Sequence, residues 1–314
     1  MIGPTTCCPD GIELVLFDLD DTILTDGAKL SPRVASAIAL ARERGAMACV
    51  SSGRPFTMVP ELLRTPAGMD YLICVNGAAI YDTMGDVLRE TPLTREQALR
   101  ALDVLKPLRP GWNCFIDGEA YFEWRGFSYI AAGRTPTMGE LKASKGGLHT
   151  GMGRFVRKVY RFSKRMITNR TGRYQVKSIR PAVEASQGVQ KLGCSFGNAR
   201  ACDRAVATLE HLGCYEVARM GRQELEITAA GVTKATAARW LMDYLKVDPA
   251  RAVAFGDSDN DAPLAEACGT FVAMENATDA IKAMADDVCE SVYDDGVARW
   301  LERAMHEADG AKHV

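Results

Sequence analysis

Two short apolar runs, far apart in the chain and each followed by acidic residues, constrain the fold more than any other feature. The first run, residues 14–17, leads into Asp18 and Asp20. The second run, residues 252–255, leads into Asp257. Their length and composition predict buried strands, and buried carboxylates are costly unless a cation or a donor pairs with them. Because Mg²⁺ prefers oxygen ligands, we expect one metal site that the fold assembles from both runs.

The segments around these runs alternate between strand and helix. Ser31 as an N-cap and Gly45 as a stop predict one helix. Strands are predicted at residues 46–50 and 71–75, and the same rhythm returns after Gly231. Such alternation favours a parallel sheet with right-handed crossovers. The predicted fold class is therefore α/β, with a Rossmann-like parallel-sheet core and helices on both faces.

The middle of the chain follows a different pattern. It predicts helices at residues 94–108 and 198–212, and a hairpin that turns at Asp117-Gly118. Helix–hairpin units are typical of an α+β module with an antiparallel sheet, so an inserted α+β domain is expected to interrupt the core. Residues 131–187 show no clear pattern. The expected ranges are 11–84 and 229–314 for the core, 85–228 for the inserted domain and 1–10 for a disordered N-terminus.

Composition excludes several classes of function. The chain has 314 residues, is 47% hydrophobic and carries a formal net charge of −2, so charge gives no signal for nucleic acid or membrane partners. No apolar run is long enough to span a bilayer, and residues 1–10 lack the features of a secretory signal. The ten cysteines include no CxxC pair, which argues against zinc and favours reduced thiols in a cytoplasmic protein.

Polar side chains gather where predicted strands end. These positions are Asp18, Asp20, Ser52, Asn76 and Asp257. In open α/β sheets, ligand sites form beyond the carboxyl ends of the strands. One carboxylate of the 18/20 pair would attack phosphorus and form an aspartyl-phosphate, while the other would move protons. A cation, a lysine and a hydroxyl around the phosphoryl oxygens would balance the negative charge.

Four motifs carry a resemblance to a known family. They are residues 18–22, Ser52 followed by residues 53–55, Lys234 at the end of residues 231–234, and residues 256–261. Taken in this order, they make the chain similar to phosphatases of the haloacid dehalogenase (HAD) superfamily, specifically the Cof-type group with a class IIB cap. The resemblance runs along both core segments, and it implies that the inserted domain is the cap.

The resemblance implies a role for each motif residue. Asp18 would be the nucleophile and Asp20 the general acid and base. Ser52 and Lys234 would hold the phosphoryl oxygens, with Ser52 preferred over its neighbour Ser51.

The cofactor implied by the resemblance is Mg²⁺. It would be bound by the Asp18 carboxylate, the Asp20 main-chain carbonyl and Asp257, with Asp261 in the outer shell of the metal or positioning Lys234. The residues expected to bind substrate are Asn76, Gly53, Arg54 and Asn260. Asn76 and Gly77 are equally compatible with a plain turn.

The predicted function is Mg²⁺-dependent hydrolysis of small phosphorylated metabolites. Sugar phosphates, nucleotides and flavin- or pyridoxal-type phosphates all fit as substrates. The alternatives are a phosphomutase on the same fold and a binding or regulatory protein without turnover. A monomer or homodimer without nucleic acid or membrane partners is expected.

Residues 141–183 contain many Lys and Arg residues but no Asp or Glu. The stretch fits a solvated face balanced by acidic surface elsewhere. It also fits a cap surface that gathers anionic substrates. Nucleic-acid binding is a third, weaker interpretation, because the stretch has no recognised nucleic-acid motif.

Overall fold

The structure, a computed structural model, describes residues 11–25, 29–123 and 173–311. Residues 1–10, for which disorder is expected, lie outside these ranges. Most of the basic stretch 141–183 also lies outside them. By its internal contacts the chain divides into two compact units. Unit 1 comprises the described residues up to Thr91 and from Gly231 onward, and unit 2 those from Pro92 to Ala230.

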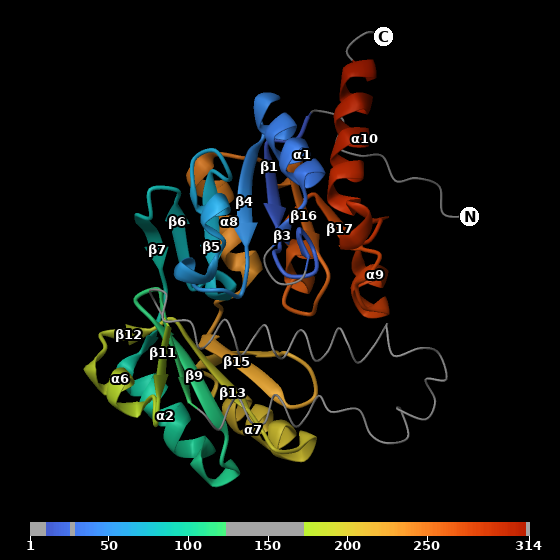
Figure 1. Cartoon of the computed structure of the whole chain (residues 1–314). Coiled ribbons are helices and arrows are strands. Elements are labelled where there is room, and N and C mark those ends of the chain that lie inside the picture. Colours follow the sequence, from blue (N-terminus) through green and yellow to red (C-terminus); the bar gives the residue numbers. More distant parts are fainter. Residues whose placement is uncertain (1–10, 26–28, 124–172, 312–314) are drawn as a thin grey trace. The chain divides into compact units, whose positions relative to one another are not determined.

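In its described part, unit 1 contains an eight-stranded sheet (Figure 1). The strand order is β18-β17-β16-β1-β4-β5-β6-β7. The pairs from β18 to β5 are parallel, and β6 and β7 are antiparallel additions. The strands are β1 (Leu14–Phe17), β4 (Met47–Ser51), β5 (Tyr71–Cys74), β6 (Ala79–Asp82), β7 (Val87–Glu90), β16 (Ala252–Gly256), β17 (Thr270–Met274) and β18 (Asp287–Cys289). The carboxyl ends of β16, β1, β4 and β5 therefore share one edge of the sheet.

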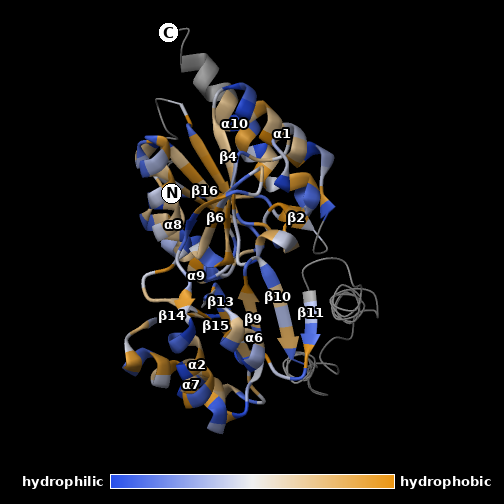
Figure 2. Cartoon of the chain, turned by 90° about the vertical axis from the view of Figure 1, so that its left-hand side faces the viewer, coloured by the Kyte–Doolittle hydropathy of each residue, from blue (hydrophilic) through white to orange (hydrophobic). Residues whose placement is uncertain are grey.

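Helices cover both faces of this sheet. Figure 2 shows α8 on one side and α1 with α10 on the other. Arg33 of α1 forms an ion pair with Glu302 of α10 at 2.6 Å. The helices of unit 1 are α1 (Pro32–Glu43), α8 (Lys234–Leu245), α9 (Asp279–Met284) and α10 (Gly296–Ala311). The short 3₁₀ turns are η1 (Phe56–Met58), η2 (Glu61–Arg64), η3 (Val75–Gly77), η5 (Pro249–Arg251), η6 (Ala262–Glu266) and η7 (Val292–Asp294), and a small hairpin pairs β2 (Leu24–Thr25) with β3 (Lys29–Leu30).

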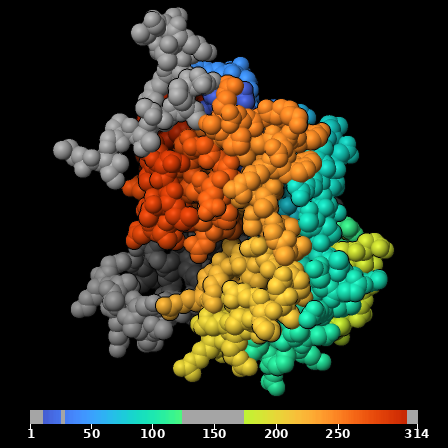
Figure 3. Space-filling model, turned by 180° about the vertical axis from the view of Figure 1, so that it is seen from behind, coloured from blue at the N-terminus to red at the C-terminus, as the bar shows by residue number. Residues whose placement is uncertain are grey.

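The two segments of unit 1 share one core. Phe17 of β1 and Phe255 of β16 stack with their ring centroids 5.7 Å apart, and Trp300 of α10 meets Phe255 edge-on at 5.3 Å. In the view of Figure 3, the orange and red residues of the second segment form much of the surface of unit 1. The central strands are buried on both faces, as a sheet covered by helices on both sides requires.

Unit 2 carries a six-stranded sheet with the order β11-β10-β9-β13-β15-β14. Neighbouring strands are antiparallel except β10 and β11, and β8 pairs with β12 in a separate ladder. The strands are β8 (Leu93–Thr94), β9 (Gly111–Ile116), β10 (Glu119–Glu123), β11 (Arg173–Val176), β12 (Gly188–Val189), β13 (Lys191–Ser195), β14 (Tyr215–Arg219) and β15 (Glu224–Ala229). Helix α2 (Arg95–Leu105) is followed by η4 (Lys106–Leu108) and packs against both α6 (Arg180–Ala185) and α7 (Ala199–Leu212).

The predicted α/β fold class is confirmed by this architecture. The Ser31 hydroxyl accepts a hydrogen bond from the Val34 N–H at 3.1 Å, so Ser31 caps α1 as expected. The predicted hairpin turn is also present, with Asp117 and Gly118 at positive φ. Among the described residues, no helix has the length and apolar composition that crossing a membrane requires.

The edge strand β7 was not predicted. Its four residues include none that is fully buried, so no alternation marks it in the sequence. Because β7 pairs with β6, the division between the units lies after Thr91 rather than at the expected boundary after residue 84.

Candidate active site

Lys234 is the centre of the candidate site. Its Nζ donates to Asp18 Oδ1 and to Asp261 Oδ1, both at 2.6 Å. The residue begins α8, whose N-cap Thr233 forms a capping box with Thr236, and the lysine is only 1% exposed. Burial alone would lower the pKa of Lys234, but the two carboxylates outweigh burial and raise it. The ammonium is therefore a fixed positive charge beside Asp18.

Asp261 holds this arrangement in place. Its Oδ2 accepts hydrogen bonds from the main-chain N–H groups of Asp257 and Ser258, each at 3.1 Å. Its Oδ1 accepts the Lys234 ammonium, so both oxygens are engaged. The close approach requires glycine at position 256, because a Cβ there would lie 2.5 Å from Cγ of Asp261. These contacts fit the expectation that Asp261 positions Lys234.

Asp18, Asp257 and Asp261 form an acidic cluster in which one ligand atom from each lies within 4.8 Å of the others. Burial raises the pKa of the Asp257 carboxyl to about 7, and the Asp261 carboxylate adds to the shift. Burial likewise raises the pKa of Asp18 well above its usual value, although the Lys234 ammonium opposes it. One lysine thus leaves the cluster with excess negative charge.

A hard cation fits this donor set. Asp257 Oδ1 accepts a hydrogen bond from the Thr22 hydroxyl at 3.1 Å. The second oxygens of Asp18 and Asp257 accept no hydrogen bond from any residue that the structure describes. Carboxylate oxygens, such as the second oxygen of Asp257, are the kind of ligand that Mg²⁺ takes. Asp261, with both oxygens engaged, is suited to the outer shell rather than to direct contact.

The Asp20 carboxylate makes a different set of contacts. It forms a bidentate ion pair with Arg54, whose Nε donates to Asp20 Oδ2 at 2.8 Å and whose terminal nitrogen donates to Oδ1. The Arg54 side chain also donates to the Met58 carbonyl at 3.1 Å. The Arg54 side chain is 10% exposed, against 52% for Asp20. The structure therefore places Arg54 against the expected general acid, a pairing that the sequence pattern does not indicate.

Ser52, Asn76 and Asn260 are brought together at the same edge of the sheet. The Ser52 carbonyl accepts the Asn76 N–H at 3.0 Å, and the Asn76 side-chain oxygen accepts from Asn260 Nδ2 at 3.2 Å. Asn76 has a φ of 57°, and Val75 before it has a φ of 55°. A β-branched residue in the left-handed region is strained, which is a feature found at functional sites.

The glycine after Asn76 brings this turn against α8. A Cβ at Gly77 would lie 2.3 Å from the Thr233 carbonyl oxygen, so only glycine allows the contact. Gly53 links Ser52 to Arg54 in the same edge region. Thr22 and Ser258 also contact the cluster. Neither was predicted to have a role, because each is one polar residue inside a longer motif.

A comparison with known protein families identifies the class of this chain. The pattern of the haloacid dehalogenase-like hydrolases matches residues 15–301, which is most of the chain. The chain therefore belongs to the haloacid dehalogenase-like hydrolases, and the resemblance inferred from its motifs is confirmed.

Curated relatives narrow the class to phosphatases. The chain is 26% identical over 298 residues to the 5-amino-6-(5-phospho-D-ribitylamino)uracil phosphatase YitU of Bacillus subtilis, covering 92% of this chain and 96% of that protein. It is 25% identical over 290 residues to the pyridoxal phosphate phosphatase YbhA of Escherichia coli, covering 92% and 97%. With the family match, these relatives define the chain as a HAD-type phosphatase.

A solved structure supports the fold independently. A haloacid dehalogenase-like hydrolase from B. subtilis superposes with a TM-score of 0.74 at 20% sequence identity, covering 93% of this chain and 99% of that one. At this identity the likeness supports the arrangement of strands and helices, not a substrate.

Proposed function

We propose that this phosphatase hydrolyses small phosphate monoesters with Mg²⁺ as cofactor, through an aspartyl-phosphate on Asp18. One observation carries the proposal: the buried Lys234 ammonium contacts only one oxygen of Asp18, which leaves the other oxygen for attack on phosphorus. The excess negative charge of the surrounding carboxylates supports a divalent cation in the same place.

In the first step, Asp18 Oδ2 forms a bond to phosphorus while the bond from phosphorus to the leaving oxygen breaks. Asp20 donates a proton to that oxygen, so the alcohol leaves neutral. In the second step, Asp20 takes a proton from water, and the water oxygen attacks phosphorus. The bond from phosphorus to Asp18 then breaks, which releases inorganic phosphate and regenerates both carboxyl groups.

The remaining residues stabilise and position these groups. Lys234 and the Ser52 hydroxyl bind the oxygens of the transferring phosphoryl group, where a preorganised positive charge lowers the barrier. Asn76 and Asn260 line the phosphate site together with Gly53. Arg54 orients Asp20 through its bidentate contact, because two parallel N–H donors fix the plane of a carboxylate.

Mg²⁺ would be held by the carboxylates of Asp18 and Asp257 and by the Asp20 main-chain carbonyl, with Asp261 behind them. When bound, it supplies Lewis-acid stabilisation of the phosphoryl oxygens and relieves the repulsion between the two anions.

The proposed substrates are small phosphorylated metabolites, with sugar phosphates and related compounds foremost. YitU and YbhA are named for two different phosphomonoesters of small molecules, which supports this class without selecting one member. Unit 2 acts in this proposal as the cap that selects the leaving group, a role typical of elements inserted into a catalytic core.

The test is phosphate release from a panel of phosphomonoesters, with Mg²⁺ and with EDTA. Asp18→Asn should abolish the release. Asp259→Asn is the matched control, because Asp259 is an exposed carboxylate of the same motif with no part in the cluster. Release that is equally fast in EDTA, or unchanged in Asp18→Asn, would overturn the proposal. Isomerised sugar phosphate in place of free phosphate would favour the phosphomutase.

A further inference from the structure

One side-chain amide in unit 1 joins three segments that are far apart in the chain. Asn276 lies in the loop between β17 and α9. Its Nδ2 donates to the Asp21 carbonyl at 2.8 Å, in the loop that follows β1. Its Oδ1 accepts the N–H of Val292, the first residue of η7, at 3.0 Å. Both ends of the amide therefore bind main-chain groups, and one of these groups belongs to the motif that contains Asp18.

The loop that carries Asn276 is itself held on both sides of this residue. The Glu275 N–H donates to the Cys289 carbonyl at 2.8 Å, and the Ala277 N–H donates to the Met274 carbonyl at 2.9 Å. Cys289 and Met274 are the last residues of the neighbouring strands β18 and β17. Asn276 thus ties the loop after β1 to the edge of the sheet rather than to a second loose segment.

The residue that Asn276 binds has an unusual backbone conformation. Asp21 has a φ of 63°, in the left-handed region that is disfavoured for residues with a Cβ. Its N–H donates to the Leu24 carbonyl at 3.2 Å, and its carbonyl accepts from Asn276. Both peptide groups that flank Asp21 are therefore fixed by hydrogen bonds, which hold the left-handed conformation in place.

The peptide group before Asp21 carries the Asp20 main-chain carbonyl. Because a peptide group is planar, the hydrogen bond from the Asp21 N–H to Leu24 also sets the direction of the Asp20 oxygen. No residue that the structure describes donates a hydrogen bond to this oxygen. It is the main-chain oxygen proposed above as a ligand of Mg²⁺, so the orientation of this peptide group affects the cation.

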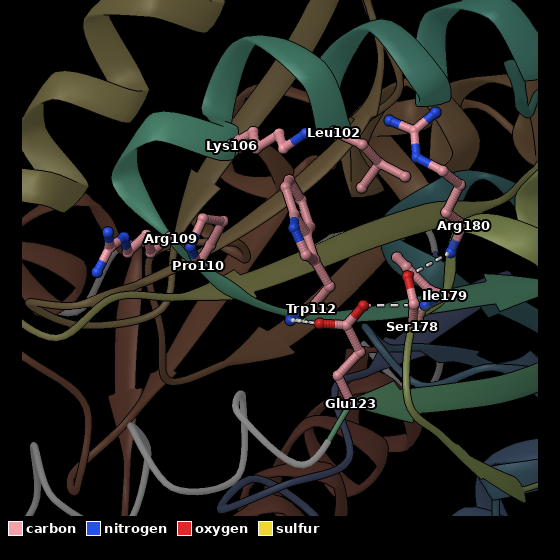
Figure 4. Close-up of a pocket in the computed structure, with 9 residues that line it drawn as sticks. All are labelled: Leu102, Lys106, Arg109, Pro110, Trp112, Glu123, Ser178, Ile179 and Arg180. Atoms are coloured by element: carbon pink, nitrogen blue, oxygen red, sulfur yellow. Dashed lines mark hydrogen bonds between the residues drawn. The ribbon is translucent and has the colours of Figure 1, made fainter.

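A side chain of unit 2 makes a similar bridge without these consequences. Glu123 Oε1 accepts the Ile179 N–H at 2.9 Å, and Oε2 accepts the Trp112 N–H at 3.4 Å (Figure 4). This carboxylate joins β10 to β9 and to the start of α6. Glu123 belongs to the other unit and offers a control for a bridge whose role is structural.

We propose that Asn276 is a positioning residue of the phosphatase. It holds Asp21 in the left-handed conformation and thereby orients the Asp20 main-chain carbonyl for a divalent cation. This inference rests on the proposed function, in which that carbonyl is a ligand of Mg²⁺. Asn276 acts through Asp21 and contacts neither the cation nor the substrate.

The test variant is Asn276→Asp combined with Glu275→Gln. Aspartate has the shape of asparagine and keeps an acceptor for the Val292 N–H, but it cannot donate to the Asp21 carbonyl. Glu275 is an exposed neighbour, so its change to glutamine keeps the net charge of the loop constant. Glu275→Gln alone is the matched control. Asn276→Ala, which adds no carboxylate, repeats the test if the double variant does not fold.

The first readout is the binding of Mn²⁺, a probe that Mg²⁺ displaces, to substrate-free full-length protein. The electron paramagnetic resonance signal of free Mn²⁺ gives the dissociation constant. We expect binding about fivefold weaker in the double variant, which corresponds to the loss of one hydrogen bond, and unchanged binding in Glu275→Gln. In kinetics, the Mg²⁺ concentration for half-maximal rate should rise by the same factor, while KM at saturating Mg²⁺ stays unchanged.

Two further variants separate positioning from a structural role. Glycine adopts a positive φ without a steric penalty, so in an Asp21→Gly background the change at Asn276 should weaken Mn²⁺ binding less than twofold. Each comparison is made within one background, so the charge lost at position 21 cancels. Glu123→Gln should lower the melting temperature in EDTA and leave Mn²⁺ affinity unchanged.

The proposal would be overturned by unchanged Mn²⁺ affinity in the double variant, whatever its melting temperature. An equal loss of affinity in Glu275→Gln, in Glu123→Gln or in the Asp21→Gly background would overturn it as well. A wild-type protein that binds no Mn²⁺ would refute this inference together with the metal of the proposed function. The expected Mn²⁺ results without phosphate release from any panel member would refute the hydrolysis alone and support the role of Asn276.

Discussion

The two units each bury a lysine, and the two lysines differ in how their charge is balanced. In unit 1, Lys234 contacts Asp18 and Asp261, and Asp257 joins the same cluster. In unit 2, Lys191 is 2% exposed and pairs with Glu226 at 2.5 Å, with its ammonium 4.7 Å from the centroid of the Phe115 ring.

This difference in charge balance distinguishes a structural ion pair, at Lys191, from a candidate catalytic site, at Lys234. An ion pair that packs against an aromatic face needs no further ligand. Three carboxylates with one ammonium leave negative charge that no further ion pair among the described residues neutralises. A buried cluster that keeps a net negative charge is typical of functional sites.

Lys234→Met should lower kcat by about 10³-fold or more, because it removes a preorganised charge from the transferring phosphoryl group. The measurement is steady-state kinetics on the best substrate of the panel, with the fold checked by circular dichroism. Replacing Asp261 as well, to relieve the unpaired carboxylate, should not restore the rate. A Lys234→Met enzyme within tenfold of the wild type would contradict the catalytic role.

Lys191→Met should instead act on stability. Removing one partner of a buried pair costs about 3 kcal/mol, and this value is the low end of the range because the Glu226 side chain is 20% exposed. The double change Lys191→Met with Glu226→Leu should recover much of the loss, since no charge is then left unpaired. Urea unfolding of the three proteins checks this. If the double variant is no more stable than the single one, the pair has a role beyond balancing charge.

Arg54→Met should lower kcat by about 10- to 100-fold on alkyl phosphates, because a loosely oriented Asp20 protonates the leaving oxygen less well. The effect should be much smaller on 4-nitrophenyl phosphate, whose leaving group needs little protonation. Comparing kcat and KM for both substrates separates this role from direct substrate binding. A rise in KM of equal size for both substrates would show instead that Arg54 binds the substrate.

The stabilisation by Mg²⁺ should grow with pH. The pKa of Asp257 is raised to about 7 in the folded protein, above its usual value of about 3.9. The contribution of this group to stability is therefore fully present below about pH 4 and is lost as the pH rises through 7 in metal-free protein. A cation that replaces the proton should restore it, so Mg²⁺ should raise the melting temperature more at pH 8 than at pH 5. An equal shift at both pH values, or an unchanged pH dependence in Asp257→Asn, would contradict this account.

Much of the candidate site could be predicted from the sequence because its residues stand at strand ends. Asp18, Ser52, Asn76 and Asp257 each follow a short apolar run, and parallel strands bring such ends to one edge. Lys234 was predictable for a different reason, since it begins a capped helix within a known motif.

The pairings between distant side chains could not be predicted. Arg54 meets Asp20, and Lys191 meets Glu226, but nothing in the spacing of either pair indicates contact, because tertiary packing brings the partners together.

The most direct test of the central claim is acid quenching of the enzyme during turnover of a ³²P-labelled substrate from the panel. We expect labelled protein from which hydroxylamine releases the label, and we expect the label in the peptide that contains Asp18. The label should be absent from Asp18→Asn and present in Asp259→Asn. Phosphate release without any labelled protein in the wild type, or label that persists in Asp18→Asn, would contradict an aspartyl-phosphate at this position.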